Sequence, residues 1–368
     1  MTLISRAAVF EAPGQPLKLT GFAVPEPGEG EAVARIRCTT ICGSDLHTCF
    51  GRRVSPAPSV LGHEMAAEIA VLGKGGVRDF RGVPLHTGDR ITWSMVWSCG
   101  ACYYCGIGMR AKCERLFKFG HERTGEGRDL SGGYAQYCLL PVGTAIFRIP
   151  DDVPDTVASP ANCATATVAA VMRHAGPVEG SSVVVYGTGM LGLTACAMAQ
   201  AGGAGQVMAI ENDAARRELS RRFGASVVLD GGEAGVVREA VRESTGGRGA
   251  DVVLEFAGHP EAVENSVDLL RFGGRLVMAG AVFPSRKLQL RGEQLVRHML
   301  RLTGVYNYEP EDLENALRFL GANGGRFPFE LLVPRRFPLD EINDAVAFAE
   351  REKPPRAAII PFPDREKL

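Results

Sequence analysis

The segment Val183-Val184-Val185-Tyr186-Gly187-Thr188-Gly189-Met190-Leu191-Gly192 decides the fold of the second half of the chain. An apolar run of strand length leads directly into a G-x-G-x-x-G pattern, and a helical pattern follows. Gly187 permits a tight turn, Gly189 lets the backbone approach a pyrophosphate, and Gly192 allows close packing of helix on strand. The segment therefore predicts a dinucleotide-binding turn at the positive end of a helix.

A carboxylate follows this turn at the distance that a dinucleotide site requires. Glu211 ends the next predicted strand, nineteen residues after the last glycine, where it can accept hydrogen bonds from the adenosine ribose. Because the same charge repels a 2′-phosphate, NAD is favoured over NADP. Arg216 and Arg217 are placed either to stack on adenine or to bind a 2′-phosphate. The backbone of Met190 and Leu191 completes the predicted cofactor site; a plain glycine turn beside a solvated Glu211 is the alternative.

Strand and helix patterns alternate around this turn. Such alternation predicts a parallel sheet with helices on both faces, and six strands make a complete doubly wound domain. The predicted strands are Val183–Tyr186, Val207–Ile210, Val227–Leu229, Val252–Phe256, Leu276–Ala279 and Leu302–Val305. The predicted helices between them are Leu191–Ala201, Ala214–Phe223, Val236–Ser244 and Glu261–Leu270.

The first 160 residues have a different texture. Short β-like alternations, such as Ala32–Cys38 and Met65–Leu72, are broken by Gly and Pro, which predicts a β-barrel or sandwich-like domain. The chain is therefore expected to be an α/β protein of two domains, as its 368 residues also suggest.

The tail after about Tyr306 is expected to return to the first domain, because the six-stranded sheet is already complete. Its predicted elements are a helix at Leu313–Leu320, a short strand near Leu331–Val333, a second helix and a final strand at Ala357–Ile360. The expected domains are residues 1–163 with 306–368, and residues 164–305.

The composition argues against a nucleic acid or a membrane as partner. The chain is 45% hydrophobic and 23% charged, with a formal net charge of -1. It has no apolar run near the roughly 20 residues that cross a bilayer. Met1–Phe10 lacks the apolar core and cleavage site of a signal peptide, so a cytoplasmic protein acting on a small molecule is expected.

Four of the ten cysteines, Cys99, Cys102, Cys105 and Cys113, lie within fifteen residues. In a reducing compartment such a cluster indicates metal ligation rather than disulfides. Four thiolates satisfy tetrahedral zinc completely and leave no open position, so a structural zinc is expected. A nucleic-acid-binding zinc module would need a basic helix beside it, and an iron–sulfur site would need a Cys-Pro context; the sequence has neither.

A second set of metal-ligand residues is dispersed along the chain. It consists of the stretch Cys42-Gly43-Ser44-Asp45-Leu46-His47, the triplet Gly62-His63-Glu64, and Cys163. Cys and His ligands from separate loops can form a three-ligand site with an open fourth position, as a catalytic zinc requires. Taken alone, His63 reads as a satisfied core histidine and Cys163 as a buried apolar thiol.

These motifs and their order resemble the zinc-dependent medium-chain alcohol dehydrogenases over nearly the whole length. The resemblance implies a GroES-like domain joined to a Rossmann domain, two zinc ions per chain and NAD(H) as cofactor. It implies Cys42, His63 and Cys163 as catalytic zinc ligands, although some relatives have glutamate at the third position. Asp45 would orient His63, and Glu64 would be a transient ligand.

The resemblance also implies a mechanism. Zinc lowers the pKa of the alcohol, and hydride passes from its carbon to the nicotinamide. Ser44 would accept the proton and His47 would pass it outward. A helix N-cap for Ser44 and a surface imidazole for His47 are the alternatives.

The substrate is indicated by a group of cationic side chains. Arg52 and Arg53 follow the Cys42 stretch, and Lys118 and His121 follow the cysteine cluster. Arginine suits bidentate recognition of a phosphonate or phosphate, and these segments resemble a subgroup associated with phosphonate catabolism. A hydroxyalkylphosphonate or its aldehyde is therefore expected; if the arginines are solvated loop charges, the substrate is a neutral polyol or simple alcohol.

Two rival functions share this fold. A zinc-free quinone-type reductase has no use for the cysteine and histidine ligands, and a non-catalytic NAD sensor has no use for a proton relay. Surfaces near Leu290–Val305 are expected to pair subunits of a homo-oligomer, either a dimer or a tetramer, as dinucleotide domains of the resembled family usually do.

Overall fold

The computed structural model describes residues 2–125 and 127–362 of the chain. These residues divide into two compact units. The first unit consists of three segments: the chain up to Cys163, Glu309–Gly324, and the chain from Phe329 onward. The second unit consists of Ala164–Tyr308 and Gly325–Pro328. Among the described residues, no helix combines the length and the apolar character needed to span a membrane.

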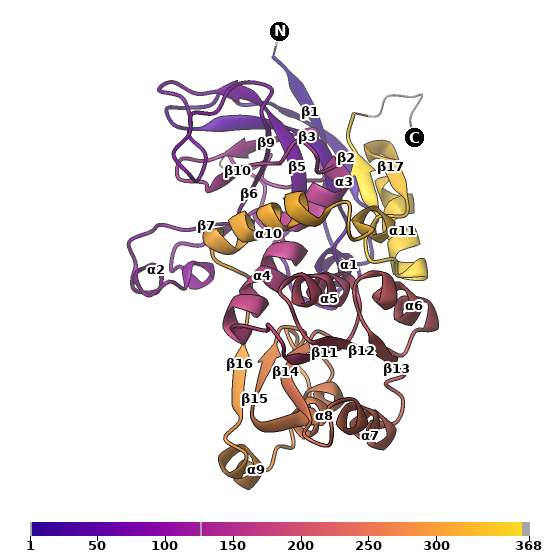
Figure 1. Ribbon diagram of the computed structural model, residues 1–368. Coiled ribbons are helices and arrows are strands. Elements are labelled where there is room, and N and C mark those ends of the chain that lie inside the picture. Colours follow the sequence, from indigo (N-terminus) through magenta and orange to yellow (C-terminus); the bar gives the residue numbers. More distant parts are fainter. Residues whose placement is uncertain (1, 126, 363–368) are drawn as a thin grey trace. The chain divides into compact units, whose positions relative to one another are not determined.

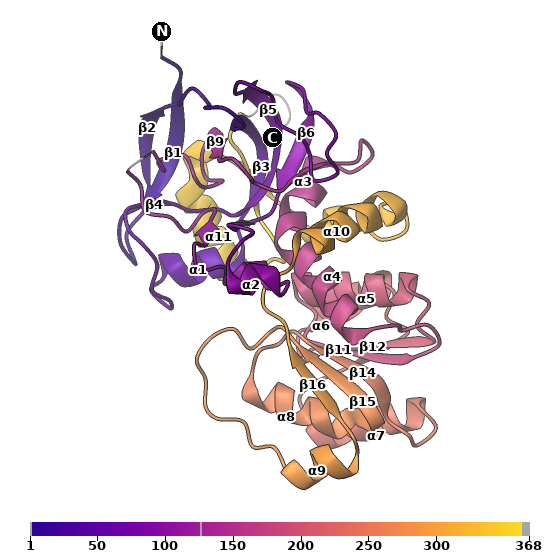
Figure 2. The ribbon, with the colours of Figure 1, turned by 90° about the vertical axis from the view of Figure 1, so that its left-hand side faces the viewer.

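The second unit is built on a six-stranded parallel sheet with the order β13-β12-β11-β14-β15-β16 (Figure 1; Figure 2 shows the same sheet turned by 90°). The chain order reverses at the central strand β11, so loops on its two sides diverge and leave a binding position between them. The strands are β11 (Ser182–Tyr186), β12 (Gln206–Ile210), β13 (Val227–Leu229), β14 (Ala250–Glu255), β15 (Leu270–Met278) and β16 (Arg301–Gly304).

Both faces of this sheet are covered, which explains the uninterrupted apolar run of β11. Val184 belongs to an apolar cluster with Val237 and Val263 of α7 and α8. Val185 points to the opposite face, where it approaches Gly192 of α5. The helices of this unit are α4 (Ala164–Ala175), α5 (Met190–Ala201), α6 (Ala214–Arg222), α7 (Ala234–Ser244), α8 (Pro260–Leu269) and α9 (Gly292–Arg297).

The first unit is β-rich (Figure 1). Its largest sheet has seven strands: β10 (Ile146–Arg148), β6 (Arg90–Trp93), β5 (Glu64–Leu72), β3 (Ala32–Thr40), β18 (Ala358–Ile360) and β17 (Arg336–Pro338) in this order, with β9 (Tyr137–Leu140) paired to β3. A second sheet joins β2 (Lys18–Ala23), β1 (Ile4–Phe10) and β4 (Ser59–Val60), and a third joins β7 (Val96–Trp97) and β8 (Phe117–Lys118). The predicted α/β fold class is confirmed: the chain has a β-rich unit and a unit built on a six-stranded parallel sheet.

Short helices in this unit carry four of the predicted site residues: Ser44, Asp45 and His47 on α1, and Cys105 on α2. The α-helices are α1 (Gly43–Cys49), α2 (Tyr103–Gly106), α3 (Asp155–Ala158), α10 (Pro310–Asn323) and α11 (Ile342–Glu352). The 3-10 helices are η1 (Arg110–Lys112), η2 (Ser159–Asn162), η3 (Phe329–Leu332) and η4 (Leu339–Glu341).

Most of the C-terminal tail belongs to the first unit, where β18 pairs antiparallel with β3, whereas Gly325–Pro328 belongs to the second unit. One predicted element of the tail is wrong: the strand expected near Leu331–Val333 is absent from the described residues, and η3 ends at Leu332. A run of three apolar residues does not distinguish a strand from a helical turn. The strand β17 begins at Arg336, after Pro334.

Candidate active site and metal centres

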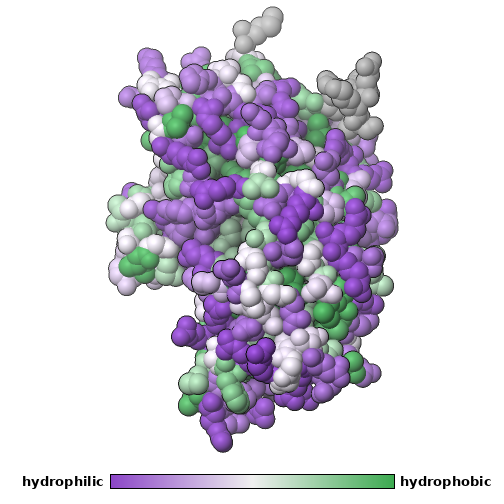
Figure 3. Space-filling view, in the orientation of Figure 1, coloured by the Kyte–Doolittle hydropathy of each residue, from purple (hydrophilic) through white to green (hydrophobic). Residues whose placement is uncertain are grey.

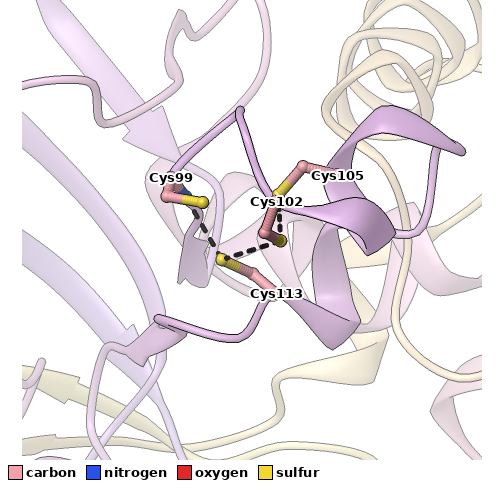
Figure 4. Close-up of side chains that lie close together, drawn as sticks. All are labelled: Cys99, Cys102, Cys105 and Cys113. Carbon is pink, nitrogen blue, oxygen red and sulfur yellow. Dashed lines mark hydrogen bonds between the residues drawn. The ribbon is translucent and has the colours of Figure 1, made fainter.

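The four clustered cysteines converge on one point. Their Sγ atoms all lie within 4.8 Å of one another, and Cys102 Sγ is 3.5 Å from Cys105 Sγ (Figure 4). The backbone N–H groups of Cys99 and Arg115 each approach Cys113 Sγ at 3.3 Å. The backbone N–H of Ala101 lowers the pKa of Cys99 to about 6. The cluster therefore has the four sulfur donor atoms of a tetrahedral zinc site.

The lobe that carries these cysteines has little apolar core of its own. Tyr103, Ile107 and Met109 are exposed on it, and hydrophobic side chains gather on this lobe at the left of Figure 3. Apart from the cysteines themselves, few side chains of the lobe are buried, so its shape depends on the cross-linking of its thiol groups.

The structure also brings the dispersed residues together. The ligand atoms of Cys42, His63, Glu64 and Cys163 lie within 4.8 Å of one another. Cys42 caps the start of α1, His63 directly precedes β5, and Cys163 directly follows η2. A hydrogen bond from Cys163 lowers the pKa of Cys42 well below its usual value against the effect of burial, and Arg356 and His63 add to this shift. A thiolate is thus favoured at Cys42.

Asp45 holds two of these residues in place. One carboxylate oxygen accepts the backbone N–H of Cys42 at 3.0 Å, and the other lies 3.3 Å from His63 Nδ1. Since Asp45 contacts Nδ1, the Nε2 atom of His63 is left to face the thiols. The geometry is that of a carboxylate that orients a metal-binding imidazole.

Ser44 and His47 lie on α1 beside this group. Ser44 Oγ is 3.4 Å from His63 Nε2. The N-cap of α1 is Cys42, so the alternative reading of Ser44 as the helix cap is wrong. Burial, together with Arg52 and Arg53, lowers the pKa of His47, so its imidazole is mostly neutral near pH 7.

An arginine that sequence reasoning missed completes the group. Arg356 is buried and donates to both carboxylate oxygens of Glu64 at 2.6 Å, and its Nη2 lies 3.6 Å from Cys42 Sγ. Thr40 Oγ1 donates to Glu64 at 2.6 Å. The one feature of the sequence that could have indicated this role is a charged residue, Arg356, just before the buried final strand β18.

Two further missed residues precede Cys163 in η2. Asn162 Nδ2 donates to the Trp93 carbonyl at 2.9 Å, and Asn162 Oδ1 accepts the Met65 N–H at 3.3 Å. Ser159 Oγ donates to the Glu64 carbonyl at 3.0 Å. Both side chains are fully buried, so they fix the turn that presents Cys163 to His63.

The four predicted substrate residues differ in their surroundings. Arg52 is 2.7 Å from Glu350, whereas Arg53 and Lys118 form no ion pair with any described residue. His121 is buried, and its ring centroid lies 5.1 Å from that of His63. Burial lowers the pKa of His121 well below its usual value, and the charges of Lys118 and Arg53 add to this shift. Two unpaired cations therefore lie near the His63 group.

The glycine turn of the second unit has the predicted geometry. Gly187 has φ +86°, which favours glycine, and a Cβ on Gly192 would lie 1.9 Å from the Gly187 carbonyl oxygen. A Cβ on Gly189, the N-cap of α5, would meet open space. The backbone at Gly189 is thus accessible at the start of a twelve-residue helix, where free N–H groups suit a pyrophosphate.

Glu211 lies directly beside this turn. One of its carboxylate oxygens accepts the Thr188 N–H at 2.9 Å, and the other accepts the Asn212 N–H at 2.9 Å. Arg217 donates to the Glu211 carbonyl and pairs with Asp230 at 3.0 Å. The Arg216 backbone N–H donates to Asp213, which caps α6. The Glu211 carboxylate is thus fixed beside the turn, and Arg217 is engaged by Asp230 and by backbone carbonyls.

The sequence matches two family models. Residues 28–151 match the alcohol dehydrogenase GroES-like domain, and residues 191–322 match the zinc-binding dehydrogenase domain. An L-threonine 3-dehydrogenase of Pyrococcus horikoshii is 34% identical over 282 residues, which is 74% of this chain and 75% of that protein. The chain belongs to the zinc-binding alcohol dehydrogenases of the medium-chain dehydrogenase/reductase superfamily.

Solved structures of zinc-binding alcohol dehydrogenases are similar over the whole length. An alcohol dehydrogenase from Thermotoga maritima has a TM-score of 0.93 at 28% identity, covering 98% of this chain and 100% of that one. A putative zinc-binding dehydrogenase from Sinorhizobium meliloti, bound to NADP, has a TM-score of 0.86 at 28% identity with the same coverage. The predicted family and the zinc-dependent oxidoreductase activity are confirmed; the rival quinone-type reductase is not supported.

Proposed function

We propose that this zinc-binding alcohol dehydrogenase carries a catalytic zinc on Cys42, His63 and Cys163 and transfers hydride between an anionic alcohol and NAD. The convergence of these three ligand atoms within 4.8 Å carries the proposal. Two thiols and one imidazole from separate loops fit zinc, because zinc prefers sulfur and nitrogen ligands and a three-ligand site leaves one position open.

The surrounding residues have separate tasks. Zinc, when bound, acts as a Lewis acid that lowers the pKa of an alcohol at the open position. Asp45 holds the His63 ring in orientation. Ser44 Oγ, 3.4 Å from His63 Nε2, is placed to accept the proton of the alcohol, and His47 on the same helix is placed to pass it to solvent.

Glu64 is held back from the open position. Its two oxygens are engaged by Arg356 and Thr40, so a transient ligand role for Glu64 requires that the ion pair with Arg356 first opens. Arg356 also places a positive charge beside Cys42, which favours the thiolate form of that ligand.

We also propose that the four-cysteine cluster holds a structural zinc. Cys105→Ser is expected to remove one zinc per chain and lower the Tm by about 5–10 °C, because the lobe has little apolar core that could hold its shape without the metal. Elemental analysis and thermal unfolding measure the two effects. The buried Cys196 of α5 supplies the control: Cys196→Ser is expected to keep both zinc ions. An unchanged zinc content in Cys105→Ser would contradict a zinc at this cluster.

We propose NAD as the preferred cofactor. The fixed carboxylate of Glu211 beside the glycine turn repels a 2′-phosphate, and Arg217 is already engaged by Asp230 and backbone carbonyls. Comparing turnover with NAD and NADP checks this preference, since a relative binds NADP.

The proposed substrate is an alcohol that bears a phosphonate or similar anion. Arg53 and Lys118 near the His63 group supply positive charge without a carboxylate partner among the described residues, whereas Arg52 is paired with Glu350. His121 donates from Nδ1 to the Phe119 carbonyl, which leaves its Nε2 as an acceptor for a substrate hydroxyl.

The two neighbouring arginines make a matched test. Arg53→Ala is expected to lower kcat/KM for a hydroxyalkylphosphonate about 10- to 100-fold, because a charge-assisted hydrogen bond is lost, and to leave a neutral alcohol unaffected. Arg52→Ala is expected to leave both substrates within about threefold. Equal effects of Arg53→Ala on both substrates would instead indicate a neutral polyol or simple alcohol.

We propose a homo-oligomer that forms through the end of the Rossmann sheet. β16 is the terminal strand of this sheet, and the nearby Val296 and Met299 are 77% and 69% exposed. Exposed apolar side chains beside an unpaired strand edge favour pairing with a second copy.

None of the ten cysteines forms a disulfide, which supports the expected cytoplasmic location.

A further inference from the structure

A buried carboxylate lies at the carboxyl end of the Rossmann sheet, outside the set of residues with an assigned role. Glu255 is the last residue of β14 and is 0% exposed. Burial raises its pKa, while the nearby N–H groups of Gly258, Ala257 and Gly280 oppose this shift. A carboxyl group at the end of a buried apolar strand destabilises the fold unless hydrogen bonds compensate for its burial.

Glu255 joins the loop after β14 to the loop after β15. Its side chain accepts the Gly258 N–H at 2.6 Å, and its backbone carbonyl accepts the N–H groups of Ala279 and Gly280 at 2.9 and 3.1 Å. A Cβ on Gly258 would lie 2.4 Å from the Gly280 carbonyl oxygen. Glu255, Gly258 and Gly280 thus form a close backbone contact between the two loops, which we call the loop clasp.

The loop clasp lies directly beside the glycine turn. Glu255 is in register with Tyr186, the residue before Gly187, and a Cβ on Gly187 would lie 2.8 Å from the Ala257 nitrogen. Glu211 lies on the other side of β11, at the end of β12. A dinucleotide with its pyrophosphate at Gly189 and its adenosine beside Glu211 must therefore extend its nicotinamide half across β14, past the loop clasp.

We propose that Glu255 is a positioning residue for the nicotinamide half of the cofactor: it sets the two loops against which that half lies. The proposal rests on the proposed dinucleotide site. This role explains why a polar residue occupies position 255. An apolar side chain would fill the same space but would leave the Gly258 N–H without its acceptor.

The two halves of the cofactor allow a selective test. NADH is titrated by fluorescence and ADP-ribose by calorimetry against the full-length unmodified chain, Glu255→Leu, Glu255→Asp and Glu255→Gln. Leucine has no acceptor, and aspartate is one methylene too short to reach Gly258. In both variants the Kd for NADH is expected to rise about tenfold or more, because one hydrogen bond to the loop is lost. The Kd for ADP-ribose is expected to stay within about twofold. Glutamine keeps a side-chain carbonyl oxygen, so Glu255→Gln is expected to restore NADH binding to within about threefold.

The outcomes separate three accounts. Equal loss of both ligands in Glu255→Leu and Glu255→Asp would show that Glu255 only stabilises the sheet, and unchanged NADH binding in both variants would show that it has no positioning role; either result overturns the proposal. If the unmodified chain bound neither NADH nor ADP-ribose, the dinucleotide site itself would be wrong and the proposal would fall with it.

Discussion

Cys163→Ala is expected to lower the turnover of the alcohol about a thousandfold or more while NADH binding changes by less than about threefold. Removing one of three ligands leaves two side chains, Cys42 and His63, which do not hold zinc tightly enough to keep the Lewis acid in place. The dinucleotide turn lies in the other compact unit, so its own hydrogen bonds are untouched by this change. NADH absorbance under saturating substrate measures the turnover.

A cysteine outside both clusters provides the control. Cys138 is fully buried in β9, and burial raises the pKa of its thiol, as expected of an apolar core residue. Cys138→Ala is expected to retain most of the turnover. If Cys163→Ala retained it as well, Cys163 would be a structural thiol and the third ligand would lie elsewhere.

The second large effect concerns two glycines of the same turn with opposite surroundings. A Cβ on Gly192 would lie 1.9 Å from the Gly187 carbonyl oxygen, whereas a Cβ on Gly189 would meet open space. Gly192→Ala must push α5 away from β11, so it is expected to lower the free energy of unfolding by about 1–3 kcal/mol and to weaken NADH binding about a hundredfold.

Gly189→Ala separates folding from binding. Its Tm is expected to stay unchanged, because Gly189 has φ −69° and free space around it. NADH binding is expected to weaken about tenfold, because the added methyl group occupies the place where the backbone approaches the pyrophosphate. Thermal unfolding and NADH titration of both variants check these expectations. Undiminished NADH binding in Gly189→Ala would place the pyrophosphate elsewhere.

Much of the fold was predictable because its signals are local. The valines of β11 are buried on both faces, which produces a continuous apolar run that only a covered parallel strand tolerates. Gly187 and Gly192 are required by backbone contacts within a few residues of each other, so the motif is visible in the sequence. The four clustered cysteines are similarly close in sequence, and their convergence follows from their spacing.

The remaining residues of the candidate site could not be predicted, because they depend on contacts between segments that are distant in the sequence. Arg356 reaches Glu64 from the C-terminal tail, and Asn162 reaches Met65 and Trp93 across the sheet; periodicity reports neither contact. Arg52 and Arg53 look alike in sequence, yet among the described residues only Arg52 pairs with a glutamate, because α11 presents Glu350. The prediction of a strand near Leu331–Val333 was wrong for a local reason: an apolar run of three residues is too short to distinguish a strand from a helical turn.

The most direct test of the central claim, that this zinc-binding alcohol dehydrogenase holds a catalytic zinc on Cys42, His63 and Cys163, is the zinc content per chain of the unmodified protein and of Cys163→Ala. We predict two zinc ions in the unmodified chain and one in the variant, which still binds NADH. Two zinc ions in both proteins would contradict Cys163 as a ligand, and one zinc in the unmodified chain would contradict the assignment of two metal sites.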